Sequence, residues 1–442
     1  MSNQLNSLAE KMLSSTDNLI EFLKSTEKYL ARFLKTDVVA LASGSAWLIA
    51  GKIANLIITI AVSIIYARFL SKETYGSYRY ILGIFGMLGI FALPGMSTSI
   101  VRSIARGHEG TFRATSRLIF ISCFAITIIG TGVAFYFGLT GRKGLGIGIL
   151  VIAVLTPFIE GLGNWRGYYE GKQLFRTKTG WTTLGNIFHG FVMAVAVLII
   201  YLADFSTSSA LALLALVHGV ATALPNILMH RKVTQAIPRD ATIEGGSLWY
   251  GLHLSFAGVP STIAYSIDSF LLYSFLGPVS VAIYSFAIAP IEQLKALINS
   301  VADVAFPRLS ITMATTAGKR AIQQTLVQKI IRASLITLLI VGTYIALSPL
   351  LFSILFPQYR EAVLPSQIFS LSLILIPISI LDKTLKAEGD LTKVYVYNIV
   401  SPILLITALV ILIPLYGIWG AIAGRIVGRI ANFLFLYILF KI

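Results

Sequence analysis

The sequence contains little charge for its length. Of its 442 residues, 12% are charged and 56% are hydrophobic, whereas an ordinary soluble domain carries about 25% charged residues. Apolar runs recur along the whole chain, and about 20 apolar residues suffice to cross a hydrocarbon layer of about 30 Å. The composition therefore excludes a soluble protein and predicts an all-α polytopic membrane protein.

Segments of alternating apolar and polar residues are also missing. A transmembrane β-strand reads as about ten residues of strict alternation, and no part of this chain follows that pattern. The sequence therefore excludes a β-barrel in the membrane.

Groups that bind metals or nucleotides are scarce. The single cysteine, Cys123, permits no intrachain disulfide and argues against a cysteine-based metal site. The five histidines are scattered along the chain: His108, His189, His218, His230 and His253. The sequence contains no Walker loop and no acidic motif in a soluble loop. We therefore expect no catalytic residues, no metal, no cofactor and no direct use of ATP, and we expect that the protein is not an enzyme.

Acidic residues are few, with 19 Asp and Glu against 35 Lys and Arg, which gives a formal net charge of +16. Such an excess could indicate a nucleic-acid partner, but the basic residues gather in short loops on one side of the expected spans, and no basic groove with interleaved aromatics is present. We expect no nucleic-acid binding. This positive bias of the loops instead predicts that both termini lie in the cytoplasm. We expect the membrane to be the cytoplasmic (inner) one.

The first residues differ from the rest. Residues 1–42 alternate acidic and basic side chains around leucines at near-helical spacing and lack the central apolar block of a signal peptide. We expect a cytoplasmic amphipathic tail that lies on the membrane surface, with a solvated helical tail as the alternative.

Twelve apolar segments fit membrane-spanning helices. Their approximate ranges are 45–69, 78–101, 117–138, 145–166, 180–203, 208–230, 248–275, 280–305, 332–356, 362–382, 394–415 and 417–440. The longest polar cytoplasmic loop divides them into two equal groups. The chain is thus expected to form a tail (1–42), an N-terminal six-helix bundle (43–231), a cytoplasmic linker (232–247) and a C-terminal six-helix bundle (248–442).

Two short motifs of the first half recur at equivalent places in the second half. The spacing of Phe69–Leu70 and Tyr78 recurs at Phe275–Leu276 and Tyr284, between the first and second span of each half. A Glu-Gly pair follows the fourth span in both, within YYEGKQLF (168–175) and LKAEGDLT (385–392). Together these echoes indicate an internal duplication, and two equivalent bundles with a binding site between them are a common transporter plan.

The stretch ARFLSKETYGSY (67–78), followed by a glycine-rich second span, resembles the Wzx-type oligosaccharide flippases of the multidrug/oligosaccharidyl-lipid/polysaccharide exporter superfamily. The usual pattern of that turn is A-R-x-L-G-P-x-x-Y-G-x-Y. Its matching positions here are Ala67, Arg68, Leu70, Tyr75, Gly76 and Tyr78. Ser71 and Lys72 replace the Gly-Pro, which appears instead at Gly277–Pro278 in the second half.

This resemblance implies a flippase that carries a polyprenyl-diphosphate-linked oligosaccharide from the cytoplasmic to the outer leaflet by alternating access. The central cavity would lie between the halves, lined mainly by the first, second, seventh and eighth spans. The expected partners are the lipid-linked oligosaccharide, the bilayer and polysaccharide assembly proteins, and the chain is expected to be a monomer. Because no nucleotide domain is present, an ion gradient (H⁺ or Na⁺) or the membrane potential would drive transport.

Charged residues inside the spans are the candidate site residues, because each costs a few kcal/mol to place there. Lys52 shares a helix face with Asn55, and its ammonium suits a diphosphate or an anionic sugar. The alternative is that Lys52 snorkels to the cytoplasmic interface. Arg79 lies at the start of the second span and could contact substrate on the outer side.

The seventh and eighth spans carry the other candidates. Asp268 could couple transport by binding a proton or sodium ion; alternatively, it forms a salt bridge or a helix-packing hydrogen bond. His253, near the inner end of its span, is a candidate substrate contact or an interfacial histidine. Glu292 and Lys295 lie on one helix face and could bind substrate or neutralise each other.

Two other functions remain open. A drug/cation antiporter of the same superfamily would favour an acid-dominated cavity, whereas the charges here are mixed with a basic bias. A membrane-embedded glycosyl-transferring or ligase enzyme would need a sizeable outer loop with catalytic side chains, and the predicted outer loops are short.

Overall fold

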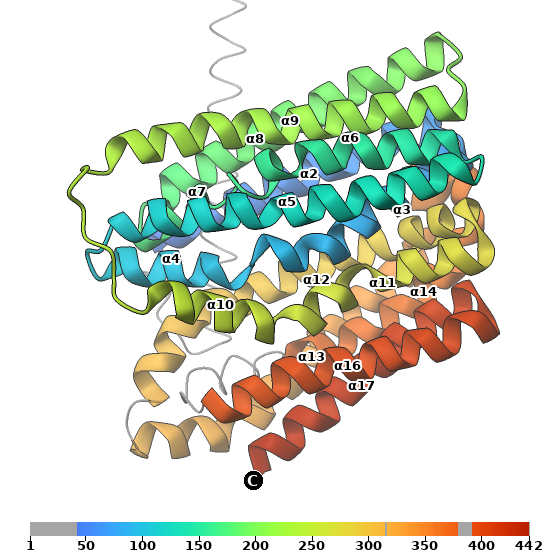
Figure 1. The fold of residues 1–442 in the computed structure, drawn as a ribbon. Helices are drawn as coiled ribbons and strands as arrows, with labels where there is room; N and C mark the ends of the chain where they lie inside the picture. Colours follow the sequence, from blue (N-terminus) through green and yellow to red (C-terminus); the bar gives the residue numbers. More distant parts are fainter. Residues whose placement is uncertain (1–41, 314–315, 379–390, 442) are drawn as a thin grey trace, which may run out of the picture.

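The computed structural model describes residues 42–313, 316–378 and 391–441, and every regular element in these ranges is helical. The N-terminal half comprises α2 (Ala42–Phe69), α3 (Lys72–Leu88), η2 (Gly89–Ala92), α4 (Gly95–Ala105), α5 (Gly110–Leu139), α6 (Lys143–Ile159), α7 (Trp165–Gly171), α8 (Phe175–Leu202) and α9 (Thr207–Ala236) (Figure 1).

The C-terminal half follows after a short linker, residues 237–246. Its elements are α10 (Ser247–Ala257), α11 (Val259–Leu276), α12 (Pro278–Met313), α13 (Thr316–Leu355), η3 (Pro357–Ala362), α14 (Val363–Ser370), η4 (Leu371–Ile378), α16 (Leu391–Tyr416) and α17 (Ile418–Lys441). The predicted tail, apart from Ala42, lies outside the described residues, as do Glu388 and Gly389 of the second Glu-Gly echo.

The helices confirm the predicted fold class, a polytopic membrane protein of two helical bundles. Each of the twelve predicted spans overlaps one helix or a broken pair of helices. Among the described residues, eight helices are long and apolar enough to cross a membrane unbroken, and the bent pair Lys72–Ala92 and Gly95–Ala105 raises the number to nine. The other predicted spans, 145–166, 248–275 and the described part of 362–382, overlap α6–α7, α10–α11 and α14–η4.

The broken spans have local causes. Between η2 and α4, Leu93 adopts a left-handed backbone conformation (φ 52°) ahead of Pro94, and the helix axis bends by 48°. Proline cannot donate the helical hydrogen bond and disfavours helical geometry in the preceding residue. Gly258 separates α10 from α11, with Pro260 in the first turn of α11.

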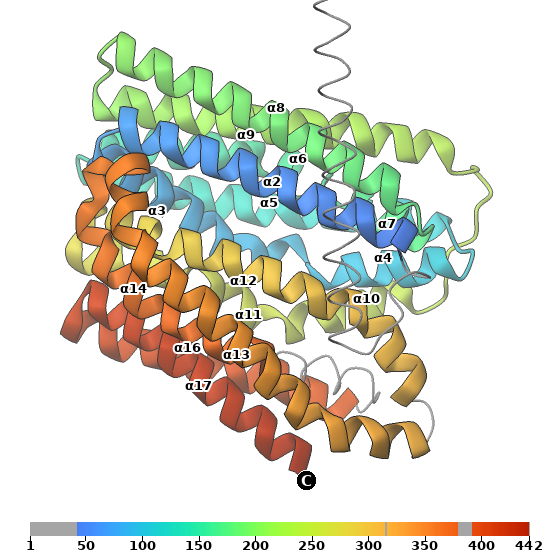
Figure 2. The same cartoon turned by 180° about the vertical axis from the view of Figure 1, so that it is seen from behind.

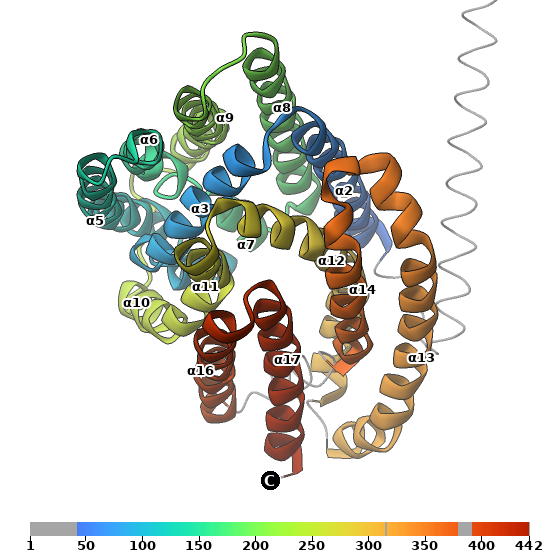
Figure 3. The ribbon, with the colours of Figure 1, turned by 90° about the vertical axis from the view of Figure 1, so that its right-hand side faces the viewer.

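Figure 3 views the molecule along the helices. One side is formed by α5, α6, α9, α8 and α2, and the other by α16, α17, α14 and α13. Between them lie α3, α11 and α12.

The predicted boundaries of the tail, the two bundles and the linker remain predictions. Helix α9 continues to Ala236, past the expected bundle boundary at 231.

The halves meet at the end of the molecule that holds the α2–α3 turn, here called the turn end. The Ser71 hydroxyl accepts a hydrogen bond from Thr74 N (3.1 Å) and caps α3, so the chain reverses at Leu70–Ser71. Arg68 Nη2 donates to Ile354 O of the other half (2.8 Å), and Lys72 forms an ion pair with Glu361. Figure 2 shows α12 and α13 extending away from the N-terminal half at the opposite end.

The linker runs along the N-terminal half at that opposite end, here called the linker end. Glu244 accepts hydrogen bonds from Ser103 Oγ (2.6 Å) and Arg106 Nη1 (2.7 Å). Gly110 N donates to Thr242 O (3.0 Å), and Arg113 Nη1 donates to Pro238 O (3.0 Å). The linker is therefore held against the turn between α4 and α5.

Candidate functional site: a cavity between the two halves

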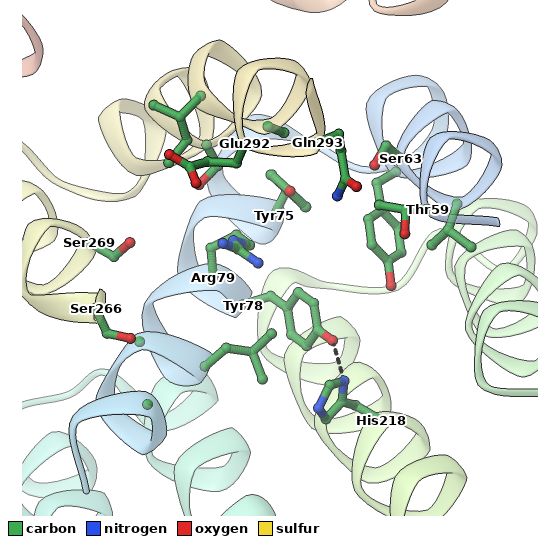
Figure 4. A pocket seen from close by; sticks show the side chains of 18 of the residues that line it. Thr59, Ser63, Tyr75, Tyr78, Arg79, His218, Ser266, Ser269, Glu292 and Gln293 are labelled. Atoms are coloured by element: carbon green, nitrogen blue, oxygen red, sulfur yellow. Dashed lines mark hydrogen bonds between the residues drawn. The ribbon is translucent and has the colours of Figure 1, made fainter. Parts of the chain in front are cut away.

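A cavity of about 590 Å³ lies between the halves. α2, α3, α8 and α9 line it from the N-terminal half, and α11, α12 and α17 from the C-terminal half. This volume is within the range of about 300–1,000 Å³ typical of ligand sites. Figure 4 shows side chains from both halves facing this space.

Arg79 is the cation at the centre of the cavity wall. It comes from α3, and its side chain points into the cavity between Tyr75 and Tyr78 (Figure 4). Within the described ranges, no carboxylate pairs with Arg79, and its buried Nε has no hydrogen-bond partner. A desolvated guanidinium is costly unless an opposite charge reaches it, so this position is suited to binding an anion.

Two histidines lie beside Arg79 on the N-terminal wall. His189 of α8 places Nε2 3.2 Å from Nδ1 of His218 on α9. The Tyr78 hydroxyl lies 2.8 Å from the same nitrogen, the contact drawn in Figure 4. His189, His218 and Tyr78 all line the cavity.

Asp268, the predicted coupling residue, lies on the opposite wall and is nearly buried, with 2% of its side chain exposed. Arg425 of α17 forms an ion pair with it and donates from Nε to Oδ2 (2.7 Å). Tyr284 OH donates to the same oxygen, and Ser269 N donates to Oδ1 (2.7 Å). The salt bridge that the sequence left open is therefore present, with Arg425 as the partner.

Glu292 joins a second ionic cluster on the same wall. It accepts from Lys295 Nζ (2.7 Å) and from Arg429 Nη2 (2.6 Å). Arg429 also lies over the Phe369 ring, 4.5 Å from its centroid. The mutual neutralisation of Glu292 and Lys295 that the sequence allowed thus occurs, and Arg429 adds a second cation. Glu292 lines the cavity, whereas Lys295 is not among its lining residues.

The remaining predicted residues are spread over three places. Asn55 lines the main cavity and accepts a hydrogen bond from Asn186 Nδ2 (2.9 Å). Lys52 lines an adjoining cavity of about 190 Å³, which shares Asn55, Thr59 and Gln293 with the first. His253 is exposed on α10, its ring 5.7 Å from that of Tyr395, and lines neither cavity. The structure thus brings Asn55, Arg79, Asp268 and Glu292 together, with Lys52 and Lys295 beside them and His253 apart.

Comparison with known proteins identifies the family. The sequence model of the family described as "Polysaccharide biosynthesis protein" matches residues 41–313. The chain belongs to this family. Its matched segment holds most of the cavity wall, from Asn55 to Gln293.

Relatives of this polysaccharide biosynthesis protein are transporters rather than enzymes, as the sequence led us to expect. It is 23% identical over 286 residues to the "Putative O-antigen transporter" of Shigella flexneri, covering 62% of this chain and 67% of that protein.

Solved structures share the fold. An inward-facing multidrug resistance MATE family transporter of the MOP superfamily superposes with a TM-score of 0.61 at 18% identity, covering 88% of this chain and 96% of that chain. The lipid II flippase MurJ in an inward closed conformation superposes with a TM-score of 0.63 at 12% identity, covering 90% of this chain and 87% of that chain.

Neutral polar groups make up much of the remaining wall of this family member's cavity. They are Thr59, Ser63, Asn186, Ser266, Ser269, Ser285 and Gln293. Hydroxyl and amide side chains both donate and accept hydrogen bonds. The cavity therefore combines one arginine that forms no ion pair with a described carboxylate, Arg79, with a broad neutral polar surface.

The sequence reasoning missed the histidine pair and the arginine partners of the two acids. His189 and His218 lie almost equidistant along the chain from the α8–α9 turn at Ala203–Phe205, and equidistant residues of an antiparallel helix pair face each other. That relation could have signalled the pair. The i, i+4 spacing of Arg425 and Arg429 was visible, but their pairing with acids on α11 and α12 depends on how α17 packs.

Proposed function

We propose that this chain flips a polyprenyl-diphosphate-linked oligosaccharide from the cytoplasmic to the outer leaflet by alternating access. The single observation that carries the proposal is Arg79, a cavity-lining cation that forms no ion pair with a described carboxylate and whose buried Nε has no hydrogen-bond partner. The second cation in that lining, Arg425, is already paired with Asp268. An anionic head group entering the cavity would therefore meet one unmatched positive charge in the middle of the molecule.

The uncharged wall suits the sugar part of such a substrate. Saccharides present many hydroxyls that both donate and accept hydrogen bonds. The threonine, serine, asparagine and glutamine side chains of the wall can form hydrogen bonds with these hydroxyls. In this proposal Asn55, Gln293 and their neighbours contact the glycan, while Arg79 holds the diphosphate. Lys52 and Lys295, placed beside the cavity, would attract the anionic group as it enters.

Alternating access requires the halves to separate at one end while they close at the other. The contacts of Arg68 and Lys72 with the C-terminal half hold the turn end together. We propose that the turn end faces outward, that both termini lie in the cytoplasm, and that the membrane is the cytoplasmic one. An ion gradient or the membrane potential would drive the cycle, with Asp268 coupling it if an ion can replace Arg425.

A drug/cation antiporter is the alternative from the same superfamily. Such a site needs an acid that a cationic ligand can reach. The two acids that line this cavity, Asp268 and Glu292, each form ion pairs with arginine. The charge balance of the cavity therefore favours an anionic ligand.

The test measures surface polysaccharide in the host strain that lacks this gene, complemented with variants at matched membrane levels. We expect Arg79→Gln to reduce export by about tenfold or more, since a hydrogen bond to a charged group contributes about 1.5–3 kcal/mol. Arg79→Lys should keep part of the activity. Lys143→Gln removes an exposed cation at the start of α6, away from the cavity, and should export normally.

The same strains separate the two functions. Normal export by Arg79→Gln would overturn the assignment of the diphosphate to Arg79. Resistance to cationic dyes conferred by the wild type, with no effect on polysaccharide export, would favour the antiporter instead.

A further inference from the structure

The two rings of the histidine pair on the N-terminal wall lie close enough to share one added proton. Because His189 Nε2 and His218 Nδ1 lie 3.2 Å apart, one nitrogen must carry a hydrogen while the other offers its lone pair. The outer nitrogen of the donor ring is the one with a free lone pair, and adding a proton there gives an imidazolium that keeps this hydrogen bond and makes it charge-assisted. A second proton would place two cations in contact, so the pair has a capacity of one.

The charges around the pair come from one neighbouring helix. Among the described residues, the titratable groups facing it are Tyr78 and Arg79 of α3, with Tyr66 of α2 beside Tyr78 (ring centroids 6.3 Å apart). α6 has no ionisable side chain beyond Lys143 at its start, and α7 contacts α9 at Asn226, toward the linker end. The acids of the cavity belong to the other half and pair with arginines there.

No described carboxylate therefore balances a proton on the pair, and Arg79 repels it. An anion bound at Arg79 removes that repulsion and replaces it with attraction. By linkage, the effect is reciprocal: the anion favours the proton on the histidines, and the proton tightens the anion.

We propose that the His189–His218 pair is a proton site that supplies the second positive charge for a diphosphate held at Arg79. The inference rests on the proposed function and extends it, because it assigns a role to residues outside the predicted site. A diphosphate joined to a lipid at one end and a sugar at the other carries two negative charges. Arg79 matches one, and the protonated pair matches the other. Loss of the proton leaves one charge unmatched and releases the head group.

The test uses purified full-length protein in lipid nanodiscs and a farnesyl diphosphate esterified to N-acetylglucosamine. Both phosphates of this probe are diesters, so its own charge stays constant between about pH 5.5 and about pH 8.5, the interval in which histidine titrates. Affinity is measured by calorimetry across the interval. Proton uptake is measured separately, with an indicator dye in weakly buffered solution as the probe binds.

We expect the wild type to bind more tightly as the pH falls, with a limiting slope of about tenfold per pH unit for one linked proton, and to take up as much as one proton per probe bound. The double variant His189→Gln/His218→Gln keeps hydrogen-bonding side chains but has no basic nitrogen at the pair. It should bind with little pH dependence and no proton uptake. His189→Gln and His218→Gln each leave one imidazole and should take up less proton than the wild type, so that misfolding of the double variant leaves the single variants informative.

His230→Gln is the matched control, because His230 lies on the same helix as His218 but packs against Phe112, outside the cavity. It should behave as the wild type does. Binding of the probe without pH dependence or proton uptake in the wild type would overturn the proton site and leave the proposed function standing. Failure of the wild type to bind the probe at any pH would overturn the proposed function, and the proton site with it.

Discussion

Gly76 lies directly against the carbonyl of Pro278, so that a Cβ atom at Gly76 would be 1.8 Å from the Pro278 oxygen. The two residues belong to the echoed turns of the two halves, ARFLSKETYGSY and the Gly277–Pro278 turn. Gly277 has a positive φ of 83°, which favours glycine. The two similar turns therefore pack on each other and add to the contacts between the halves at the turn end.

Gly76→Ala should open the turn end. Overpacking by one methyl group costs about 1–3 kcal/mol, which shifts the balance between closed and open forms by about tenfold. Cysteines placed at Lys72 and Glu361, whose side chains pair in the closed form, should be cross-linked correspondingly less. The background carries Cys123→Ala to remove the native thiol.

Gly132→Ala is the control for that experiment, because nothing lies within 4 Å of a Cβ added there. It should leave the cross-linking unchanged. Equal cross-linking of the Gly76→Ala and control proteins would show that the halves meet differently at the turn end.

Asp268→Asn should destabilise the protein strongly. The change leaves the Arg425 guanidinium buried without its anion, and removing one partner of a buried pair costs about 3–5 kcal/mol. Thermal unfolding in detergent measures the loss. Asp268→Asn/Arg425→Gln, which removes both charges, should recover part of it, whereas Lys72→Gln breaks an exposed pair and should cost at most about 1 kcal/mol.

The double variant also tests coupling at Asp268. Loss of gradient-dependent transport in a protein that folds well would support Asp268 as the coupling residue. Equal transport by the single and wild-type proteins, with and without an ion gradient, would assign the residue to structure alone.

Asn226→Ala should loosen the packing of α7 on α9. Trp165 Nε1 donates to Asn226 Oδ1 (3.0 Å), and Asn226 Nδ2 donates to Ile159 O (2.8 Å). The substitution leaves the buried indole N–H unsatisfied, at a cost of about 1–3 kcal/mol. A double-mutant cycle with Trp165→Phe, followed by chemical unfolding, should show a coupling energy between the two side chains. Strictly additive effects would contradict this hydrogen bond.

Glu244→Gln should release the linker at neutral pH. The hydrogen bond from Ser103 is the main cause that lowers the pKa of Glu244; partial burial acts against it, and Arg106 adds to it. Because the folded pKa is lowered, the contact is fully stabilising above about pH 4.3, the ordinary value for glutamate. It is lost as the pH falls through the lowered folded pKa.

Hydrogen exchange reports this release. The amide of Glu244 donates to Thr111 Oγ1 (3.0 Å), so its exchange should be slow in the wild type at neutral pH and faster in Glu244→Gln. Arg239→Gln changes an exposed linker charge and should leave the exchange rate unaltered. Unchanged protection in Glu244→Gln would show that the carboxylate does not hold the linker.

Much of the architecture could be predicted from the sequence alone. The lengths of the apolar segments predicted the spans. A helix that crosses lipid must form its backbone hydrogen bonds internally and face apolar surroundings along its length. Leu93–Pro94 and Gly258 with Pro260 then explain why two of those spans are broken. The turn at Leu70–Ser71 was also identifiable, since capping and turn formation depend on neighbouring residues.

The ion-pair partners of the buried charges could not be predicted from the sequence in the same way. Periodicity showed that Arg425 and Arg429 share a helix face, but not which helix that face meets. Arg425 and Arg429 reach Asp268 and Glu292 because of where α17 packs in the C-terminal half. His189 meets His218 because α8 and α9 pack as an antiparallel pair. Local sequence determines helices and turns through short-range sterics and solvation. Helix packing decides which buried charges are neutralised and which, like Arg79, stay exposed to the cavity.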